Sequence, residues 1–256
     1  MSLLDEIPPR YELKYLITED LVPSIRQTIR NTCKIDRYAG PDGTYRIRSL
    51  YFDTARYELF MANEHEQRDR FKVRARAYPG KTSPVFLEVK RRVLDVIIKS
   101  RVAVPADKWL DVLAGKSEVI DQLPKGGREK AHVFLSRYFR HHLEPVLLVE
   151  YEREAYESQY DAYARATFDR NILAQEQRTL SLEADPHRWR PIDHRAQTRT
   201  NQIVTVLELK FERRPPAWMS SLVRGYELSR YSFSKYCYGL QAELTLPSVE
   251  RFPVFG

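Results

Sequence analysis

The stretch FKVRARAY (71–78) decides the fold of this chain, because apolar residues alternate along it with Lys72, Arg74 and Arg76. Successive side chains of a β-strand point to opposite faces, so the three cationic residues share one face. Like charges stacked a few ångströms apart repel one another unless water or a polyanion compensates them. The stretch therefore predicts a strand whose unrelieved cationic row lines a cavity or channel for a ligand with several phosphate groups.

Five further segments show the same alternation, and the charged residues of each fall on one face. They are RYELKY (10–15), TYRIRSLYF (44–52), VFLEVK (85–90), VIIKSRVAV (96–104) and TVLELKFE (205–212). In three of them a glutamate stands two residues before a lysine, namely Glu12, Glu88 and Glu208. Isolated carboxylates are an economical way to bind one metal ion among many phosphate contacts, so all three are candidate metal ligands.

Strand-like segments number about eight and predict a mainly β (α+β) fold. They fall near 10–17, 45–53, 70–78, 85–91, 95–104, 146–155, 163–170 and 203–212. Segments that are polar on one face and apolar on the other fit a closed eight-stranded antiparallel barrel with flanking helices, because closure removes sheet edges. The apolar positions would then face outward under the helices. The alternative is an ordinary sheet with its apolar face on a core and its charged face in water.

Four segments show the helical spacing of apolar residues: 20–33, 105–115, 128–142 and 218–230. Asp20 is the expected N-cap of the first. Residues 183–202 have no periodicity and predict a long loop. The charged strands run from Lys14 to Lys235 without a Gly-, Ser- or Pro-rich linker, so residues 1–256 are expected to form a single domain.

The chain is basic, with 42 Lys and Arg against 35 Asp and Glu, a net charge of +7 and a pI near 9.3. This charge indicates an acidic partner, and nucleic acid, an anionic membrane surface and a polyphosphate all fit it. Base stacking needs aromatic side chains beside the cations, whereas the aromatic residues here mostly alternate onto the apolar faces. Nucleic acid is therefore the weaker partner.

Other features bear on where the protein works. Cys33 and Cys237 form neither a disulfide framework nor a metal-binding spacing, which favours a reducing compartment. No apolar run approaches the ~20 residues that span a bilayer. Residues 1–10 lack the basic region and apolar run of a signal peptide. We expect a soluble, cytoplasmic protein, and the sequence indicates no oligomeric state.

Several short segments occur in a fixed order: RYELKY, SLYFDT, FKVRARAY, FLEVKRR, IIKSRV, VEYEREAY, YARATFD, VLELKF and FSKY. Together, over roughly residues 8–240, they resemble the VTC domain, the polyphosphate polymerase domain of the vacuolar transporter chaperone complex, and its bacterial relatives. That domain belongs to the triphosphate tunnel metalloenzymes, alongside CYTH-type adenylate cyclases. The resemblance implies an eight-stranded antiparallel tunnel that binds triphosphate or polyphosphate through Lys and Arg, together with Mn²⁺ or Mg²⁺.

Matched to the family motifs, the resemblance assigns phosphate contacts to Lys14, Arg74, Arg76, Lys90, Lys99, Arg153 and Arg165. The strand pattern adds Arg48, Arg101 and Lys210 to these candidates. Catalytic roles are expected for Lys90, Arg153 and Lys235, the last being the lysine of FSKY. Tyr231, Phe233 and Cys237 lie at even spacing from Lys235, so this lysine interrupts an apolar face, and the resemblance selects a position in the tunnel. Among the candidate metal ligands, the resemblance selects Glu208.

Two departures from the family motifs shape the functional interpretation. Arg10 stands where the CYTH signature Glu-x-Glu-x-Lys begins, which weakens a two-metal hydrolase and favours the VTC branch, and Ser232 replaces a lysine before FSKY. The leading hypothesis is a metal-dependent phosphotransferase that extends polyphosphate from ATP. The alternatives are hydrolysis of inorganic or nucleoside triphosphate on the same scaffold, and a non-catalytic polyphosphate-binding module. Coupling to a membrane would need a separate membrane partner.

Overall fold

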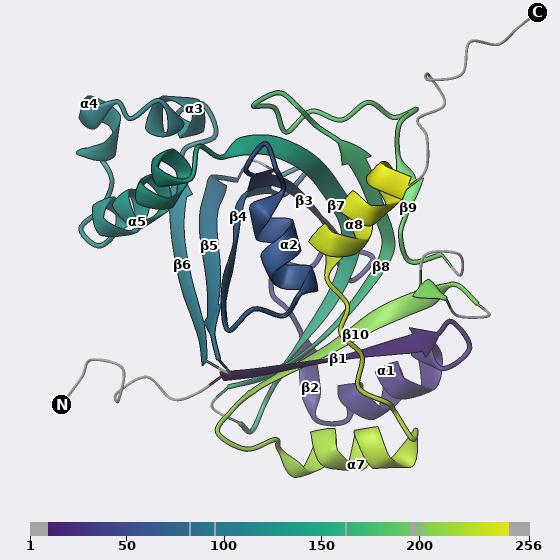
Figure 1. Cartoon of the computed structure of the whole chain (residues 1–256). Coiled ribbons are helices and arrows are strands. Elements are labelled where there is room, and N and C mark those ends of the chain that lie inside the picture. The colour runs from purple at the N-terminus through teal and green to yellow at the C-terminus, as the bar shows by residue number, and fades with distance from the viewer. Residues whose placement is uncertain are drawn as a thin grey trace, which may run out of the picture. The chain divides into compact units, whose positions relative to one another are not determined.

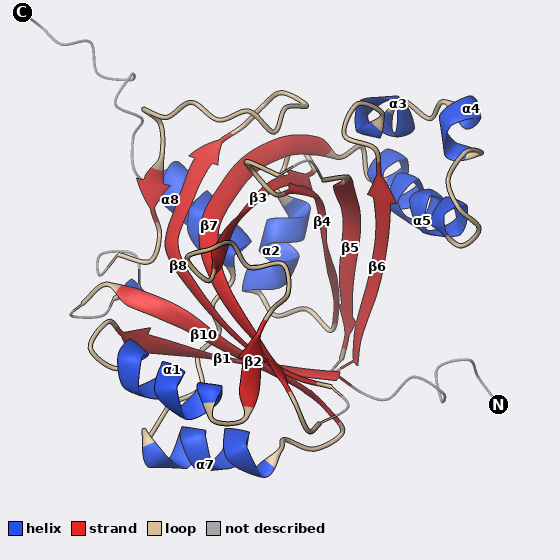
Figure 2. Cartoon of the chain, turned by 180° about the vertical axis from the view of Figure 1, so that it is seen from behind, coloured by secondary structure: helices blue, strands red, loops and turns tan. Residues whose placement is uncertain are grey.

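The structure is a computed structural model that describes residues 10–81, 83–94, 96–161, 163–194, 198–199 and 202–245. Within these residues, ten strands form an antiparallel sheet flanked by helices (Figures 1 and 2). The chain divides into two compact units, each built from three segments. The first holds the residues up to Arg46, 151–172 and 193–234. The second holds 47–150, 173–192 and the residues from Lys235 onward.

The first unit is a group of antiparallel strands covered by two helices. Its elements are β1 (Arg10–Thr18), α1 (Val22–Arg30), β2 (Cys33–Ile35), β10 (Val204–Glu212) and α7 (Ala217–Gly225), with parts of β3 (Thr44–Asp53), β7 (Glu144–Ser158) and β8 (Ala164–Glu176). β10 pairs with β1 on one side and with β8 on the other, and β2 pairs with the end of β7. Figures 1 and 2 both show α1 and α7 beside these strands.

A hydrophobic core joins these helices to the sheet. Ile25 and Ile29 of α1 and Leu222 of α7 pack in one buried cluster with Leu207 and Leu209 of β10. The apolar residues of the helices, spaced about one turn apart, therefore pack against alternate residues of the strand. Burying each such aliphatic side chain stabilises the fold by about 1.5–3 kcal/mol. The apolar face expected for 205–212 is confirmed.

The second unit carries the remaining elements. They are most of β3, α2 (Glu58–Glu64), β4 (Asp69–Ala77), β5 (Val85–Val93), β6 (Val96–Val104), α3 (Trp109–Leu113), α4 (Ser117–Ile120), α5 (Gly127–Arg140), the start of β7, the end of β8, β9 (Arg190–Pro191) and α8 (Lys235–Thr245). β3, β4, β5 and β6 pair in sequence order, all antiparallel. β9 pairs with the end of β8.

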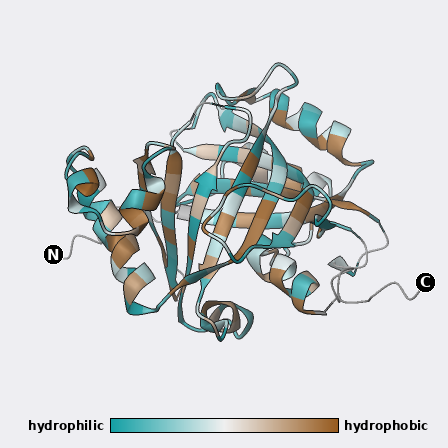
Figure 3. Cartoon of the chain, turned by 90° about the horizontal axis from the view of Figure 1, so that it is seen from above, coloured by the Kyte–Doolittle hydropathy of each residue, from teal (hydrophilic) through white to brown (hydrophobic). Residues whose placement is uncertain are grey.

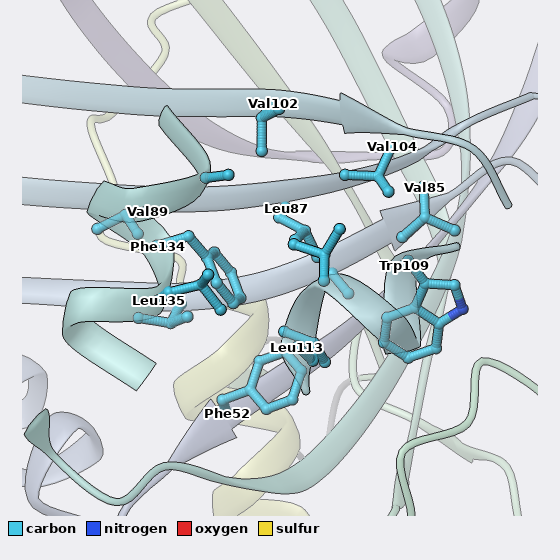
Figure 4. Close-up of a cluster of buried hydrophobic side chains, with 14 of the residues drawn as sticks. Phe52, Val85, Leu87, Val89, Val102, Val104, Trp109, Leu113, Phe134 and Leu135 are labelled. Atoms are coloured by element: carbon cyan, nitrogen blue, oxygen red, sulfur yellow. The ribbon is translucent and has the colours of Figure 1, made fainter. Parts of the chain in front are cut away.

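The core of the second unit lies where α3 and α5 cover one face of β4, β5 and β6 (Figure 4). Phe134 of α5 and Trp109 of α3 pack among Leu87 and Val102 of the strands. The positions expected to be apolar, Val73, Ala75, Val85, Leu87 and Val89, are all buried, so this prediction is confirmed. Figure 3 shows the same alternation as hydrophobic and hydrophilic residues that succeed one another along the strands.

The prediction of a closed eight-stranded barrel is wrong in two respects. Among the described residues there are ten strands, and the sheet runs β1-β10-β8-β7-β3-β4-β5-β6, with β1 and β6 as its unjoined ends. The additional strands, β2 and β9, are three and two residues long, too short to show an alternation in the sequence. Closure depends on hydrogen bonds between end strands, which the polarity of each strand does not specify.

The predicted helices are confirmed in place but not in every boundary. α1 begins after Leu21 rather than at Asp20, and α3 is shorter than the segment 105–115. The sequence pattern missed α2, α4 and α8. In α8 the buried residues Tyr236 and Leu240 are four apart, so the even spacing around Lys235 does not reflect an extended strand. The predicted loop 183–202 contains β9, and its residues 195–197, 200 and 201 lie outside the described residues.

Two smaller expectations can be compared with the structure. Cys33 and Cys237 are both buried and unbridged. None of the helices in the described ranges combines the length and the apolar character that crossing a membrane requires.

Candidate functional site

The cationic face of the second unit is set by the register of β4, β5 and β6. Two consecutive rows cross these strands, the lysine row Lys72–Lys90–Lys99 and the Glu88 row Arg74–Glu88–Arg101. Residues directly opposite in an antiparallel sheet point to the same side, so all six side chains share one face. The other face is the apolar one beneath α3 and α5. The alternation in the sequence thus becomes a two-dimensional array of charges.

Glu88 is the centre of this array. Its side chain is 1% exposed, and Oε2 lies 2.6 Å from Nη2 of Arg74 and 3.4 Å from Nη2 of Arg76. Oε1 lies 3.3 Å from Nζ of Lys99 and 3.4 Å from Nε of Arg101. Burial alone would raise the pKa of Glu88, but the charges of Arg74, Lys99 and Arg101 and the hydrogen bond from Arg74 outweigh it and lower the pKa to about 2. Arg74 and Arg76, which have no acidic neighbour within their own strand, are therefore paired with a carboxylate of the neighbouring strand β5.

Several polar atoms beside Glu88 are buried without a hydrogen-bond partner among the described residues. They include Ser49 Oγ, Arg76 Nε and Arg101 Nε. Ser49 of β3 lies directly opposite Arg76 of β4, so two of these atoms belong to neighbouring side chains. An unpaired buried polar group is costly, and a bound ligand or water can supply its partner. Tyr51, also on β3, accepts a hydrogen bond of 3.0 Å from Nη1 of Arg74.

Arg48 lies on the other face of β3. It is opposite Ala77, whereas its neighbour Ser49 is opposite Arg76. The Arg48 Nε donates a 2.7 Å hydrogen bond to the carboxylate of Glu150. The structure therefore places Arg48 apart from the Glu88 row, and hydroxyl side chains of β3 lie beside that row instead. The sequence did not predict that Ser49 and Tyr51 lie beside the Glu88 row. Only the pairing of β3 with β4 shows that their side chains are on the same face as Arg74 and Arg76.

A second charged cluster lies on β1, β10 and β8 of the first unit, and its charges alternate in sign. Two rows cross these strands, Glu12–Lys210–Arg165 and Lys14–Glu208–Thr167. Lys14 Nζ lies 3.6 Å from Glu12 and 3.8 Å from Glu208. Lys210 Nζ lies 3.8 Å from Glu12 and 2.7 Å from Glu208. This Glu–Lys quartet (Glu12, Lys14, Glu208 and Lys210) brings together two candidate metal ligands and two candidate phosphate ligands.

Arg153 of β7 completes the surroundings of Glu208. Its guanidinium donates hydrogen bonds of 2.6 and 2.7 Å to Asp169 and lies 3.7 Å from Glu208. Burial is the largest single effect and lowers the pKa of Arg153, but the charges of Asp169, Tyr151 and Glu208 and the hydrogen bonds to Asp169 together raise the pKa well above its ordinary value. Burial likewise lowers the pKa of Lys14, and the carboxylates of Glu12 and Glu208 raise it further than burial lowers it. Both cations therefore stay charged although they are largely enclosed.

Within the quartet, the oxygen atoms suit a divalent cation. Glu12 and Glu208 supply two carboxylates, and Thr167 Oγ1, in the same row as Glu208, is buried without a hydrogen-bond partner in the described part of the chain. Mg²⁺ commonly takes one or two carboxylates and completes its coordination with water and phosphate. No group of three or more His, Cys, Asp or Glu side chains within the described ranges could hold a metal alone. Glu88, which faces four cations, suits this role less well.

The other predicted site residues take separate places. Lys90 is the middle of the lysine row. Arg165 is exposed and pairs with Glu157. Lys235 is the half-buried first residue of α8 rather than part of an extended segment.

The start of α8 is anchored in the second unit by its neighbouring residues. The Tyr236 hydroxyl donates a hydrogen bond to the buried carboxylate of Asp53, which also accepts the backbone N–H groups of Leu59 and Phe60 at 2.8 Å each. A Cβ on Gly239 would lie 2.8 Å from Cδ2 of Leu147, so a glycine is needed for α8 to approach β7 this closely. Lys235 is thus carried by a firmly placed helix.

A family model described as the VTC domain matches residues 9–244. Among solved structures, the chain is similar to a candidate adenylate cyclase from Bacillus halodurans, with 12% identity, a TM-score of 0.48, and coverage of 90% of this chain and 94% of that one. It is also similar to a candidate adenylyl cyclase from Hippeastrum described as having a dominant triphosphatase activity, with 13% identity, a TM-score of 0.47, and coverage of 93% and 98%. No curated protein matches the chain.

We expect acid to destabilise the protein more than it destabilises a Glu88→Gln variant. The pKa of Glu88 is about 2 in the folded protein against an ordinary value of 4.5. Its charge therefore stabilises the fold above about pH 4.5, and this contribution is lost as the pH falls through about 2. The difference in free energy of unfolding between parent and variant should shrink by about 3 kcal/mol over that range.

Urea unfolding at several pH values measures this difference. Glu118→Gln, which removes an exposed carboxylate of α4, is the matched control and should follow the parent closely. A constant difference between the parent and Glu88→Gln across the range would show that Glu88 is not held charged by its neighbours.

Proposed function

This chain belongs to the VTC domain family, and we propose that it is a metal-dependent phosphotransferase that extends polyphosphate with the terminal phosphate of ATP. The observation that carries the proposal is the Glu88 row. In and beside this row, the four cations Arg74, Arg76, Lys99 and Arg101 surround the Glu88 carboxylate. Ser49 Oγ and Arg76 Nε are buried there without a hydrogen-bond partner among the described residues. This excess of positive charge suits several phosphate oxygens.

The side chains of this face match what phosphoryl transfer requires. The reaction depends mainly on positioning and on stabilising negative charge, with little covalent participation by the protein. Arg74 and Arg76 offer planar groups that hold phosphate oxygens in pairs, and Lys90 and Lys99 act as compact charges that can follow a moving phosphate. The terminal oxygen of the chain attacks the γ-phosphorus of ATP, the bond to the bridging oxygen breaks, and ADP leaves. Because that attacking oxygen is already an anion, no general base is needed.

The Glu–Lys quartet is a proposed metal-binding site of the first unit. Glu12 and Glu208, with Thr167 beside them, would hold Mn²⁺ or Mg²⁺. When bound, such an ion neutralises charge on phosphate oxygens. Arg153 orients Glu208 through its own pairing with Asp169 and supplies a further positive charge.

One assay separates this function from the two alternatives. Purified protein is incubated with ATP and Mn²⁺, and the products are resolved by size. Long polyphosphate supports the polymerase. Release of free phosphate alone would assign hydrolysis, and tripolyphosphate binding without turnover would assign a binding module.

Arg74→Ala and Arg76→Ala are each expected to weaken tripolyphosphate binding by ~1–3 kcal/mol, the range for a lost charge-assisted hydrogen bond. Arg91→Ala is the matched control, because Arg91 lies on the opposite face of β5 and pairs there with Asp69. It removes the same charge and should change the affinity much less. Calorimetric titration measures all three, and parent-like binding by both Arg74→Ala and Arg76→Ala would remove β4 from the site.

Glu208→Gln should separate metal use from anion binding. The substitution keeps the size of the side chain but removes the charge that would hold a cation. We expect turnover with Mn²⁺ to collapse and Mn²⁺ binding, followed by electron paramagnetic resonance, to weaken, while tripolyphosphate still binds. Glu118→Gln again serves as the control. Unchanged Mn²⁺ binding in Glu208→Gln would move the metal role to another carboxylate.

A further inference from the structure

We propose that the cationic face of β4, β5 and β6 continues past the lysine row into an outer subsite, formed by Arg70, Lys72 and Arg92. This subsite binds the additional phosphates of a polyphosphate chain longer than triphosphate. The inference rests on the proposed function, because it takes the Glu88 row as the place where the first phosphates bind.

Strand register extends the face by one more row. Arg70 of β4 lies opposite Arg92 of β5, two residues beyond the lysine row on each strand. Same-face neighbours along a strand are ~6.6–6.8 Å apart, so this outermost row lies ~13 Å from the Glu88 row. A single phosphate group cannot contact both rows. A linear chain of phosphates can.

Charge along this face is strongly unequal. Within the three described strands it carries eight cationic residues, namely Arg70, Lys72, Arg74, Arg76, Lys90, Arg92, Lys99 and Arg101, and one acidic residue, Glu88. Glu88 contacts four of the eight. Like charges stand directly opposite one another at Arg70–Arg92 and at Lys72–Lys90, an arrangement that weakens a sheet. A ligand with regularly spaced negative charges would relieve this repulsion along the whole face.

Hydrogen bonds to backbone oxygens orient the two outer arginines. Arg70 Nη1 donates a 2.7 Å hydrogen bond to the backbone oxygen of Gln67, and Arg92 Nε donates one of 2.9 Å to the backbone oxygen of Leu94. Side chains that are already placed lose less freedom when a ligand binds, which favours affinity.

The chemistry of these rows favours polyphosphate over nucleic acid. The lysine row and the outermost row contain cationic side chains and Ile97, and neither contains an aromatic residue. Single-stranded nucleic acid is usually held by aromatic side chains that stack on bases beside the cations. A polyphosphate chain has no bases and needs only the charges.

The test compares two ligands on one variant. Arg70→Gln, Lys72→Gln and Arg92→Gln are combined, and binding of tripolyphosphate and of a long-chain polyphosphate is titrated at physiological salt. We expect the affinity for the long chain to fall about 10- to 100-fold, as for three partly exposed charge contacts, while tripolyphosphate affinity stays near that of the parent. The matched control combines Lys125→Gln, Lys130→Gln and Arg140→Gln, which removes the same charge from exposed positions at and just before α5.

Each outcome is decisive. Equal losses in the two triple variants would attribute the effect to net charge and overturn the subsite, as would equal losses for the two ligands. An oligonucleotide that competes as well as long-chain polyphosphate would also overturn it. Parent-like tripolyphosphate binding by Arg74→Ala and Arg76→Ala would instead contradict the proposed function. Thermal unfolding checks that the triple variant is folded, and the single Arg70→Gln and Arg92→Gln variants repeat the comparison if it is not.

Discussion

The pairing of one buried carboxylate with four cations is the interaction on which the charged face depends. Glu88 is almost fully enclosed, and its neighbours keep it ionised by lowering its pKa to about 2. Removing a partner from a buried ion pair leaves an uncompensated charge and costs about 3–5 kcal/mol. Glu88 therefore fixes the spacing of four cations with a single negative charge. That combination gives a rigid surface that is still attractive to an anion.

The two units solve the problem of enclosed charge in different ways. In the second unit one carboxylate serves four cations, so the surface remains strongly positive. In the first unit the Glu–Lys quartet is balanced, with two carboxylates and two ammonium groups in alternation. A balanced set can accept a small cation together with an anion, whereas an unbalanced set favours the anion alone. The proposed roles in metal binding and in phosphate binding follow this difference.

Local patterns in the sequence predicted what is local in the structure. The alternation in 71–78 and in 85–90 placed Arg74 and Glu88 on strands with the correct faces, because a period of two needs no knowledge of neighbours. Features that depend on how strands pair were not predicted. They are the unjoined ends of the sheet, the face of Arg48, and the position of the Ser49 hydroxyl opposite Arg76. α8 was not predicted because the short run of residues around Lys235 fits both the spacing of a strand and that of a helix. Only the burial of its residues in the fold decides between the two.

The alternating charges of β1 and β10 have a further consequence for how the strands align. Glu12 faces Lys210 and Lys14 faces Glu208. Sliding one strand by two residues would keep every side chain on its own face, so the apolar residues alone would tolerate it. Such a slide would set Glu12 against Glu208 in one direction and Lys14 against Lys210 in the other, and like charges directly opposite are unfavourable. The residues proposed to bind metal and phosphate thus also select one alignment of the two strands during folding.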